Sequence, residues 1–404
     1  MALKDRPRYL EKLVSLKDSE FIKVIVGMRR CGKSSLLELF AEYLLNNGVK
    51  KEHIIKMNFE SAECIRLTDY EKLLNELLPR LENDSYNERN YLLLDEIQLV
   101  QGWERAVNAL RLKENVDIYL TGSNAYMLSS QIATLLSGRY VEIPVYPLSF
   151  REFVFYTESD APNESLLRRF LMYGGLPPVV EQGENHNLAQ TVLSGIYNTV
   201  FVKDIAQHVQ IRNQSVFTDI ASYLADTSGS SVSITNIENR LKSAQRKTAN
   251  ETIERYLQSL VDAFLFYRVK RLDLHGGAIL QGLEKYYPAD LGIRNMLLGF
   301  PSGNYGFALK NVVHNELRVR GYEIGIGKIN SLEIDFVATK PGETLFIQVC
   351  ASLLDDNTRV RELEPLLRLP NKKGRKLVIT YDTIGTGVND EIEIINAIEW
   401  LMNE

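Results

Sequence analysis

Short apolar runs alternate with longer stretches of helical periodicity over the first third of the chain. The apolar runs are FIKVIV, HIIKMNF, YLLLDEI and DIYLTGS, and apolar residues recur at helical spacing between them, near 34–45, 70–81 and 103–112. Apolar runs of this length are typical of strands that are buried on both faces of a parallel sheet. The pattern from about 21 to 145 therefore predicts an α/β fold with helices on both faces of a parallel sheet.

The chain beyond residue 150 changes its pattern twice. Residues 151–212 look mainly helical, with a Gly-Gly-Leu-Pro break at 174–177. Three helical segments and two strand-like runs, FLFYRVKRLD and EKYYPAD, follow within 213–290, which is the order of a winged helix. Residues 291–404 combine a helix, strands at EIDFVAT, TLFIQVC and KLVITYD, and a closing helix predicted at 390–403. We expect a small α/β domain there.

Composition and charge limit the classes of partner. The chain has 404 residues and a formal net charge of -5, so no global positive field attracts nucleic acid or membrane, and any DNA contact needs a local patch. The three cysteines form no Cys-x-x-Cys pair, which argues against a disulfide framework or a zinc site. We see no export signal and no apolar stretch of about 18 residues, so we expect a cytoplasmic protein without membrane contact.

The most specific motif is VGMRRCGKSSLL, which lies between a predicted strand and a predicted helix. Its glycines let backbone N–H groups surround phosphate oxygens at the positive end of the helix. We expect Lys33 to reach the β- and γ-phosphates of a nucleotide and the Ser34 hydroxyl to bind Mg²⁺. The residues expected around the phosphates are Gly27, Met28, Arg29, Arg30, Cys31, Gly32, Lys33, Ser34 and Ser35.

Two polar clusters follow neighbouring apolar strands. YLLLDEIQ ends in Asp95 and Glu96, which we assign to the Mg²⁺ shell and to the attacking water, and the second acid favours hydrolysis over binding alone. DIYLTGSNAYML ends in Ser123 and Asn124, either of which could hydrogen-bond the γ-phosphate or the water. The same two residues could instead cap a helix.

Three further residues of the phosphate loop have open roles. Arg29 and Arg30 could hold a triphosphate or a neighbouring acid, or could simply pack in salt bridges. Cys31 lies near a helix N-terminus, which could lower the pKa of its thiol, but we expect it to be a small residue that fits the loop.

In these motifs the chain resembles an AAA-type P-loop ATPase of the bacterial and archaeal family that has a C-terminal domain of unknown function. The matching segments, in order, are GMRRCGKSSLL, YLLLDEIQ, LTGSNAYML, LLSGRY, PLSFREF and YGGLPPVV, which span most of the first 180 residues. The resemblance implies ATP and Mg²⁺ as cofactors and Asn124 as a sensor, with Ser123 as the alternative. It also implies that Arg139 is an arginine finger, acting in cis or across a homo-oligomer, although an ordinary surface arginine is equally consistent.

The resemblance extends to a winged helix in the segment ENRLKSAQRKTANETIERYLQSL. Lys242, Arg246 and Lys247 could contact DNA phosphates there, while Glu251 and Glu254 on the following helix oppose DNA binding. Winged helices also serve as protein-binding modules and rigid connectors, so both interpretations stay open.

The last domain resembles the PD-(D/E)XK nuclease fold. Glu316, Asp335, Gln348 and Cys350 match the order of its motif. Gln348 replaces a carboxylate ligand of Mg²⁺, and Cys350 cannot supply the positive charge of lysine. Lys328 or Lys340 could provide a migrated lysine, but the spacing does not require it. We expect a degenerate scaffold in which Asp335 and Glu316 survive as a pair, without nuclease activity.

These interpretations divide the chain into an ATPase core at 1–150, a helical lid or connector at 151–212, a winged helix at 213–290 and a nuclease-like domain at 291–404. The expected function is Mg²⁺-dependent ATP binding and hydrolysis that drives a conformational switch. An ATP-dependent DNA-binding or remodelling factor, and a nuclease or nuclease-derived defence effector, are the two alternatives.

Overall fold

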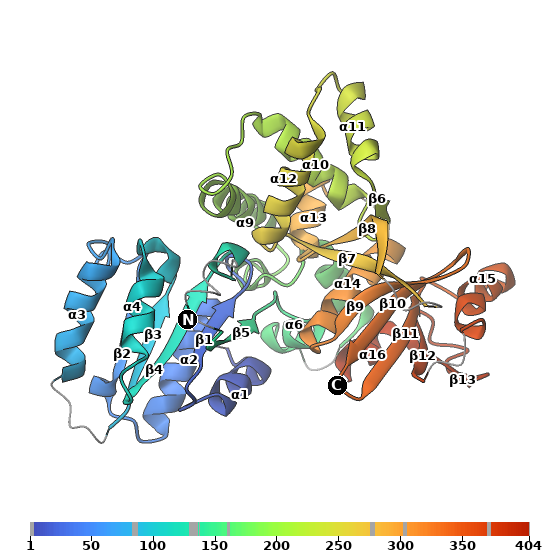
Figure 1. Cartoon of the computed structure of the whole chain (residues 1–404). Coiled ribbons are helices and arrows are strands. Elements are labelled where there is room, and N and C mark those ends of the chain that lie inside the picture. Colours follow the sequence, from blue (N-terminus) through green and yellow to red (C-terminus); the bar gives the residue numbers. More distant parts are fainter. Residues whose placement is uncertain are drawn as a thin grey trace. The chain divides into compact units, whose positions relative to one another are not determined.

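The chain folds into two compact units in a computed structural model (Figure 1). The first unit comprises 1–146 and 262–264, and the second comprises 147–261 and 265–404. Each unit is described by itself. The structure describes residues 4–82, 88–128, 136, 138–159, 162–274, 279–301, 305–369 and 373–403.

The first unit is built on five parallel strands in the order β2-β3-β4-β1-β5. The central strands β1, β3 and β4 are buried along their whole length, as their continuous apolar runs predict. The strands are β1 (Ile22–Val26), β2 (Ile54–Asn58), β3 (Asn90–Asp95), β4 (Val116–Gly122) and β5 (Tyr140–Pro144).

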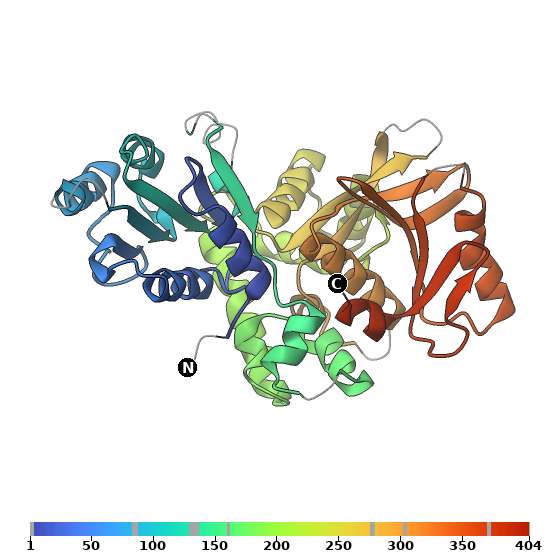
Figure 2. The same ribbon diagram turned by 90° about the horizontal axis from the view of Figure 1, so that it is seen from below.

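Helices cover both faces of this sheet (Figures 1 and 2). On one face, α3 and α4 pack on Leu92 and Leu120 in a single apolar core. On the other, the ring of Phe40 in α2 packs at a tilt against Tyr119, whose ring centroid lies 4.5 Å away. The helices are α1 (Pro7–Ser15), α2 (Lys33–Asn46), α3 (Tyr70–Glu82) and α4 (Trp103–Leu110), with 3-10 turns at Lys51–His53, Ile97–Leu99 and Ala125–Leu128. The predicted fold class is confirmed.

The second unit begins with a helical region that packs around Phe150, Phe153 and Phe170. A capping box starts its first helix, because the Ser149 side chain and the Glu152 side chain each bind the other's backbone N–H. The helices are α6 (Phe150–Tyr156), α7 (Glu164–Tyr173), α8 (Pro177–Val180) and α9 (His186–Thr199), which continues into a π-helical turn at Val200–Ile205.

Asp290 explains the Gly-Gly-Leu-Pro break. Its buried carboxylate accepts the N–H groups of Gly175 at 2.7 Å and of Ile293 at 3.1 Å, the latter at the start of α13 (Leu291–Leu297). A Cβ atom on Gly174 would lie 2.3 Å from this carboxylate, so the close approach requires glycine. Burial raises the pKa of Asp290 to about 6. This acid ties the helical region to α13.

A helix, a short strand, two helices and a hairpin come next. The hairpin strands β7 and β8 are antiparallel, and β6 pairs with β8 at the edge. The winged-helix prediction was based on this order of helices and strands, and the assignment remains a prediction. The elements are α10 (Gln214–Asp226), β6 (Ser231–Val232), α11 (Ile234–Ser243), α12 (Asn250–Asp262), β7 (Phe266–Asp273) and β8 (Ile279–Pro288).

The hairpin continues into a nine-stranded sheet of order β13-β14-β12-β11-β10-β9-β7-β8-β6, since β7 pairs in parallel with β9. Helices α14 and α16 contribute to one apolar core against this sheet. Helix α15 contacts β11 and contributes to a second apolar core (Figure 2). The remaining elements are α14 (Tyr305–Val319), β9 (Glu323–Ile329), β10 (Leu332–Lys340), β11 (Glu343–Val349), α15 (Asp356–Leu367), β12 (Arg375–Thr380), β13 (Gly387–Asn389), β14 (Ile392–Asn396) and α16 (Ala397–Met402).

Two sequence-based expectations for this region need comment. The segments 213–290 and 291–404 share one sheet, and the four-domain division remains a prediction. The closing helix predicted at 390–403 is wrong in its first half, which forms β14. Its β-branched isoleucines fit a buried strand, and the Asn396 side chain caps α16 by accepting the N–H of Ile398.

Within the described ranges, no helix is both long enough and apolar enough to cross a membrane.

Candidate nucleotide site

The turn between β1 and α2 is a tight loop in which two positions require glycine. A Cβ atom on Gly27 would lie 2.0 Å from the Val145 carbonyl oxygen, so no other residue fits there. Gly32 has a φ of 103°, in the left-handed region that favours glycine. The buried Lys33 ammonium donates to the Gly27 carbonyl at 2.9 Å and to the Met28 carbonyl at 3.1 Å. Lys33 is therefore held inside the loop, at the start of α2.

Arg6 supports this loop from behind. Its guanidinium donates to the Cys31 carbonyl at 2.9 Å and to the Tyr146 carbonyl at 3.1 Å. The Cys31 thiol is fully buried and donates to the Val145 carbonyl at 3.3 Å, and burial raises the pKa of that thiol. A raised pKa disfavours the reactive thiolate, in keeping with the packing role expected for Cys31. Arg6 was not singled out from the sequence.

Asp95, the last residue of β3, is held by neutral hydrogen-bond donors. The Thr121 hydroxyl donates to its Oδ1 at 2.6 Å and the Asn58 amide to its Oδ2 at 2.9 Å. Burial raises the pKa of the Asp95 carboxyl, and hydrogen bonds from the Thr121 and Ser34 hydroxyl groups oppose that rise. The fold thus brings together Ser34 and Asp95, the two residues predicted to bind Mg²⁺.

Glu96 follows in a left-handed conformation, with a φ of 57°. Its N–H donates to the Thr121 hydroxyl at 2.8 Å, and its Oε1 accepts the Ser123 hydroxyl at 2.6 Å. Arg29 lies 3.8 Å from its Oε2 and 3.0 Å from the Glu60 carboxylate. Arg29 therefore faces neighbouring acids, which was one of the two roles left open for it.

The remaining candidate residues near the phosphate loop differ in how exposed they are. Asn124 follows Ser123 directly and is 2% exposed, whereas Arg30, Ser34 and Ser35 are exposed. The strand pairs Val26–Gly122 and Asn58–Asp95 put the carboxyl ends of β1 to β4 at one edge of the sheet. The loop, the acid pair and the sensor candidates thus meet at that edge.

Arg139 lies at the opposite edge. It is exposed and precedes β5, whose first residue Tyr140 pairs with Ile22 at the start of β1. The phosphate loop follows the other end of β1, about 13 Å away along the strand. The fold therefore does not bring Arg139 to the phosphate loop of its own chain. Residues 135 and 137 of the LLSGRY motif lie outside the described residues.

Sequence reasoning missed the side chains that orient the two acids, chiefly Thr121, Asn58 and Gln98, whose amide donates to Glu96. A signal was present for two of them. Asn58 ends β2 and Thr121 is the next-to-last residue of β4, so both are polar residues near the carboxyl ends of strands beside β3. Only the strand order shows that they reach Asp95.

The candidate DNA-contacting residues are largely paired with acids. Lys242 lies 2.7 Å from Glu238, and Arg246 forms an ion pair with Asp219. Lys247 is exposed.

In the region predicted to resemble a nuclease, Asp335 is paired with a lysine. The Lys310 ammonium of α14 donates to its Oδ1 at 2.6 Å, and the Val349 N–H donates to its Oδ2 at 2.9 Å. Gln348 accepts the Asp335 N–H at 2.8 Å, and burial raises the pKa of Cys350 to about 12. No group of three metal-ligating side chains occurs among the residues that the structure describes.

The residues considered as partners of Asp335 have other contacts of their own. Glu316 is paired with Arg320 at 2.8 Å, and the Arg320 guanidinium also donates to the Trp400 carbonyl of α16. Lys328 donates to a nearby backbone carbonyl, and Lys340 pairs with Glu343. The lysine beside Asp335 is Lys310 of α14, which was not considered from the sequence, and the Glu316–Asp335 pair remains a prediction.

Comparison with known proteins places the chain in a class and then in a family. A family described as "AAA domain" matches residues 19–154, and one described as a domain of unknown function matches 164–304. The Walker-type ATPase of Pyrococcus abyssi has a similar fold, with a TM-score of 0.51 and 17% identity over 73% of this chain and 95% of that one. The first unit is thus a P-loop NTPase fold with an AAA domain.

Two curated proteins are similar over nearly the whole length. An uncharacterized protein of Haemophilus influenzae is 40% identical over 99% of both chains. An uncharacterized protein of Methanocaldococcus jannaschii is 31% identical over 94% of this chain and 88% of its own. The chain belongs to the family that includes these bacterial and archaeal proteins.

Proposed function

We propose that the protein is a Mg²⁺-dependent ATPase whose nucleotide state switches the arrangement of its C-terminal segments. The observation that carries this proposal is the meeting of four groups at one edge of the sheet. Lys33 lies in the phosphate loop, the Ser34 hydroxyl bonds to Asp95, and Glu96 follows directly. These are the parts that phosphoryl transfer to water requires.

The residues present fit a nucleotide with its metal ion. Gly27 passes so close to the Val145 carbonyl that a side chain is excluded, and Gly32 has a left-handed backbone, so the loop has the glycines that a phosphate-binding turn requires. Ser34 and Asp95 form an oxygen-only donor pair, the kind of ligand that Mg²⁺ prefers. When bound, Mg²⁺ neutralises charge on the β- and γ-phosphate oxygens.

Each side chain then has a role in binding or hydrolysis. Lys33 exchanges its carbonyl partners for phosphate oxygens and so holds the triphosphate. Glu96 orients the attacking water and accepts its proton, while Ser123 and Arg29 fix the carboxylate. Asn124 or Ser123 senses the γ-phosphate at the same edge.

Arg139 acts only across a homo-oligomer in this proposal. Its place at the opposite edge of the sheet supports a role in trans over one in cis. A neighbouring copy would present it to the phosphates, so the specific activity should rise with protein concentration over the range of assembly.

The C-terminal segments serve as interaction domains in this proposal. The segments 151–212, 213–290 and 291–404 act as connector, winged helix and nuclease-like scaffold. The elements α10 to β8 support the winged helix, since β6 pairs with β8 as the first strand of such a module would. The γ-phosphate biases the switch because contacts to it exist in one state and are lost in the other.

The alternatives have less support. An ATP-dependent DNA factor needs free positive charge on the winged helix, but Lys242 and Arg246 are paired with acids. A nuclease needs a carboxylate cluster, and Asp335 is paired with Lys310 instead.

Two substitutions test the ATPase proposal. We expect Lys33→Ala to abolish ATP binding, and Glu96→Gln to retain binding while turnover falls by about 100-fold or more, since Glu96 acts only on the attacking water. ATP binding is measured with a fluorescent analogue and turnover by phosphate release.

The exposed residues Lys51 and Glu42 supply matched controls. Lys51→Ala and Glu42→Gln make the same chemical changes away from the cluster and should leave both measurements unchanged. A Glu96→Gln variant that hydrolyses ATP at the wild-type rate would show that Glu96 does not act on water.

A further inference from the structure

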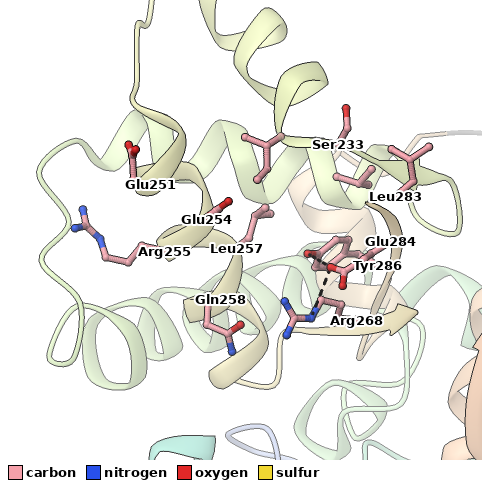
Figure 3. Close-up of a pocket in the computed structure, with 12 residues that line it drawn as sticks. Ser233, Glu251, Glu254, Arg255, Leu257, Gln258, Arg268, Leu283, Glu284 and Tyr286 are labelled. Atoms are coloured by element: carbon pink, nitrogen blue, oxygen red, sulfur yellow. Dashed lines mark hydrogen bonds and ion pairs between the residues drawn. The ribbon is translucent and has the colours of Figure 1, made fainter. Parts of the chain in front are cut away.

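A groove of about 810 Å³ lies between the outer face of α12 and the strands β6 to β8 (Figure 3). Its floor is apolar, and Leu257 and Tyr286 contribute to it at 6% and 4% exposure. Leu283 is 40% exposed at the rim and adds apolar surface beside this floor. The groove has the size of a specific binding site.

The charges around this floor are unevenly balanced. Arg268 lies 3.8 Å from Glu284, and these two side chains neutralise each other. Glu251 and Glu254 are exposed and form no ion pair with any residue that the structure describes. Figure 3 shows Glu254 directed into the space beside Leu257. Arg255 also lines the groove, so the two carboxylates of Glu251 and Glu254 outnumber its one guanidinium, and the open charge of the groove is negative.

This face of α12 is the one that DNA would meet if the segment were a DNA-reading winged helix, because the second helix of the pair enters the major groove. Glu251 lies in the first turn of α12, and Glu254 follows one turn later. Carboxylates at these positions repel phosphates, which supply most of the affinity of a protein for DNA. The groove thus disfavours DNA.

We propose that this groove binds a basic amphipathic segment of a partner protein. Apolar side chains of the segment would cover Leu257 and Leu283, and lysine or arginine side chains would pair with Glu251 and Glu254. The apolar floor contributes affinity, and the acidic rim selects the sign of the partner's charge.

The test uses the full-length protein and two fluorescein-labelled peptides. One peptide has leucines on one helical face and lysines on the other, and its match has glutamates in place of the lysines. Fluorescence anisotropy should show binding of the lysine peptide alone. We expect Glu251→Lys/Glu254→Lys to weaken that binding about tenfold and to strengthen binding of the glutamate peptide, because the rim charge is reversed.

Controls separate the groove from general charge effects. Glu181→Lys/Glu184→Lys makes the same charge change at two exposed positions of the turn that follows α8 and should leave both affinities unchanged. Leu283→Ser tests the apolar rim. It should weaken binding of the lysine peptide without reversing the preference for the lysine peptide over the glutamate peptide. Glu254→Gln is the milder variant if the double reversal fails to fold.

Three results would overturn the proposal. Equal affinity of wild type and the double variant for the lysine peptide would remove the groove as the site. Double-stranded DNA that binds wild type and displaces the lysine peptide would assign the surface to nucleic acid. If wild type is a dimer, the double variant is a monomer and neither peptide binds, the groove is a contact with a second copy of the chain.

Discussion

Two strand acids, Asp95 in the first unit and Asp335 in the second, both stand where a metal-dependent site would need them. Asp95 accepts from the neutral groups of Thr121 and Asn58, so its negative charge stays available for a cation. Asp335 accepts from the Lys310 ammonium, which already supplies a positive charge. The neighbours of a carboxylate, more than its place in a motif, decide whether it can hold a metal ion.

Thr121 offers the sharpest way to test the arrangement around Asp95. Its hydroxyl bridges Asp95 and the backbone of Glu96, so Thr121→Val should lower ATP turnover by about 10- to 100-fold with the fold intact. Phosphate release measures the rate. Thr121→Ser keeps the hydroxyl and should retain most of the wild-type turnover. Unchanged turnover in Thr121→Val would mean that the Thr121 hydroxyl does not position the two acids.

Lys310 offers the matching test in the second unit. Lys310→Met should lower local stability by about 1–2 kcal/mol, since it leaves the nearly buried Asp335 carboxylate without its charged donor. Hydrogen exchange at the Val349 amide, which bonds to Asp335, measures the loss. ATP turnover should stay at the wild-type rate, and a large fall in turnover would contradict the assignment of Asp335 to a structural ion pair.

Local sequence was enough to single out the residues at the core of the candidate site in the first unit. The glycines, Lys33 and Ser34 are contiguous, and Asp95 with Glu96 ends a continuous apolar run, so both motifs carry their own strand and helix context. The parallel sheet was predictable for the same reason, because its central strands are buried on both faces and have no polar alternation.

Contacts between distant segments could not be predicted from the sequence. Thr121 and Asn58 meet Asp95 only because β3 lies between β2 and β4, which no local pattern specifies. Lys310 reaches Asp335 because α14 packs against this part of the sheet. The sequence drew attention to Asp335 but not to this partner.

Metal binding by the two acids tests the central claim most directly. Mn²⁺ titration in the presence of a non-hydrolysable ATP analogue, followed by electron paramagnetic resonance, counts the bound ions. We predict one ion per chain in wild type, loss of that ion in Asp95→Ala and its retention in Asp335→Ala. Loss of the ion in Asp335→Ala, or its retention in Asp95→Ala, would contradict the assignment of the metal site to Asp95.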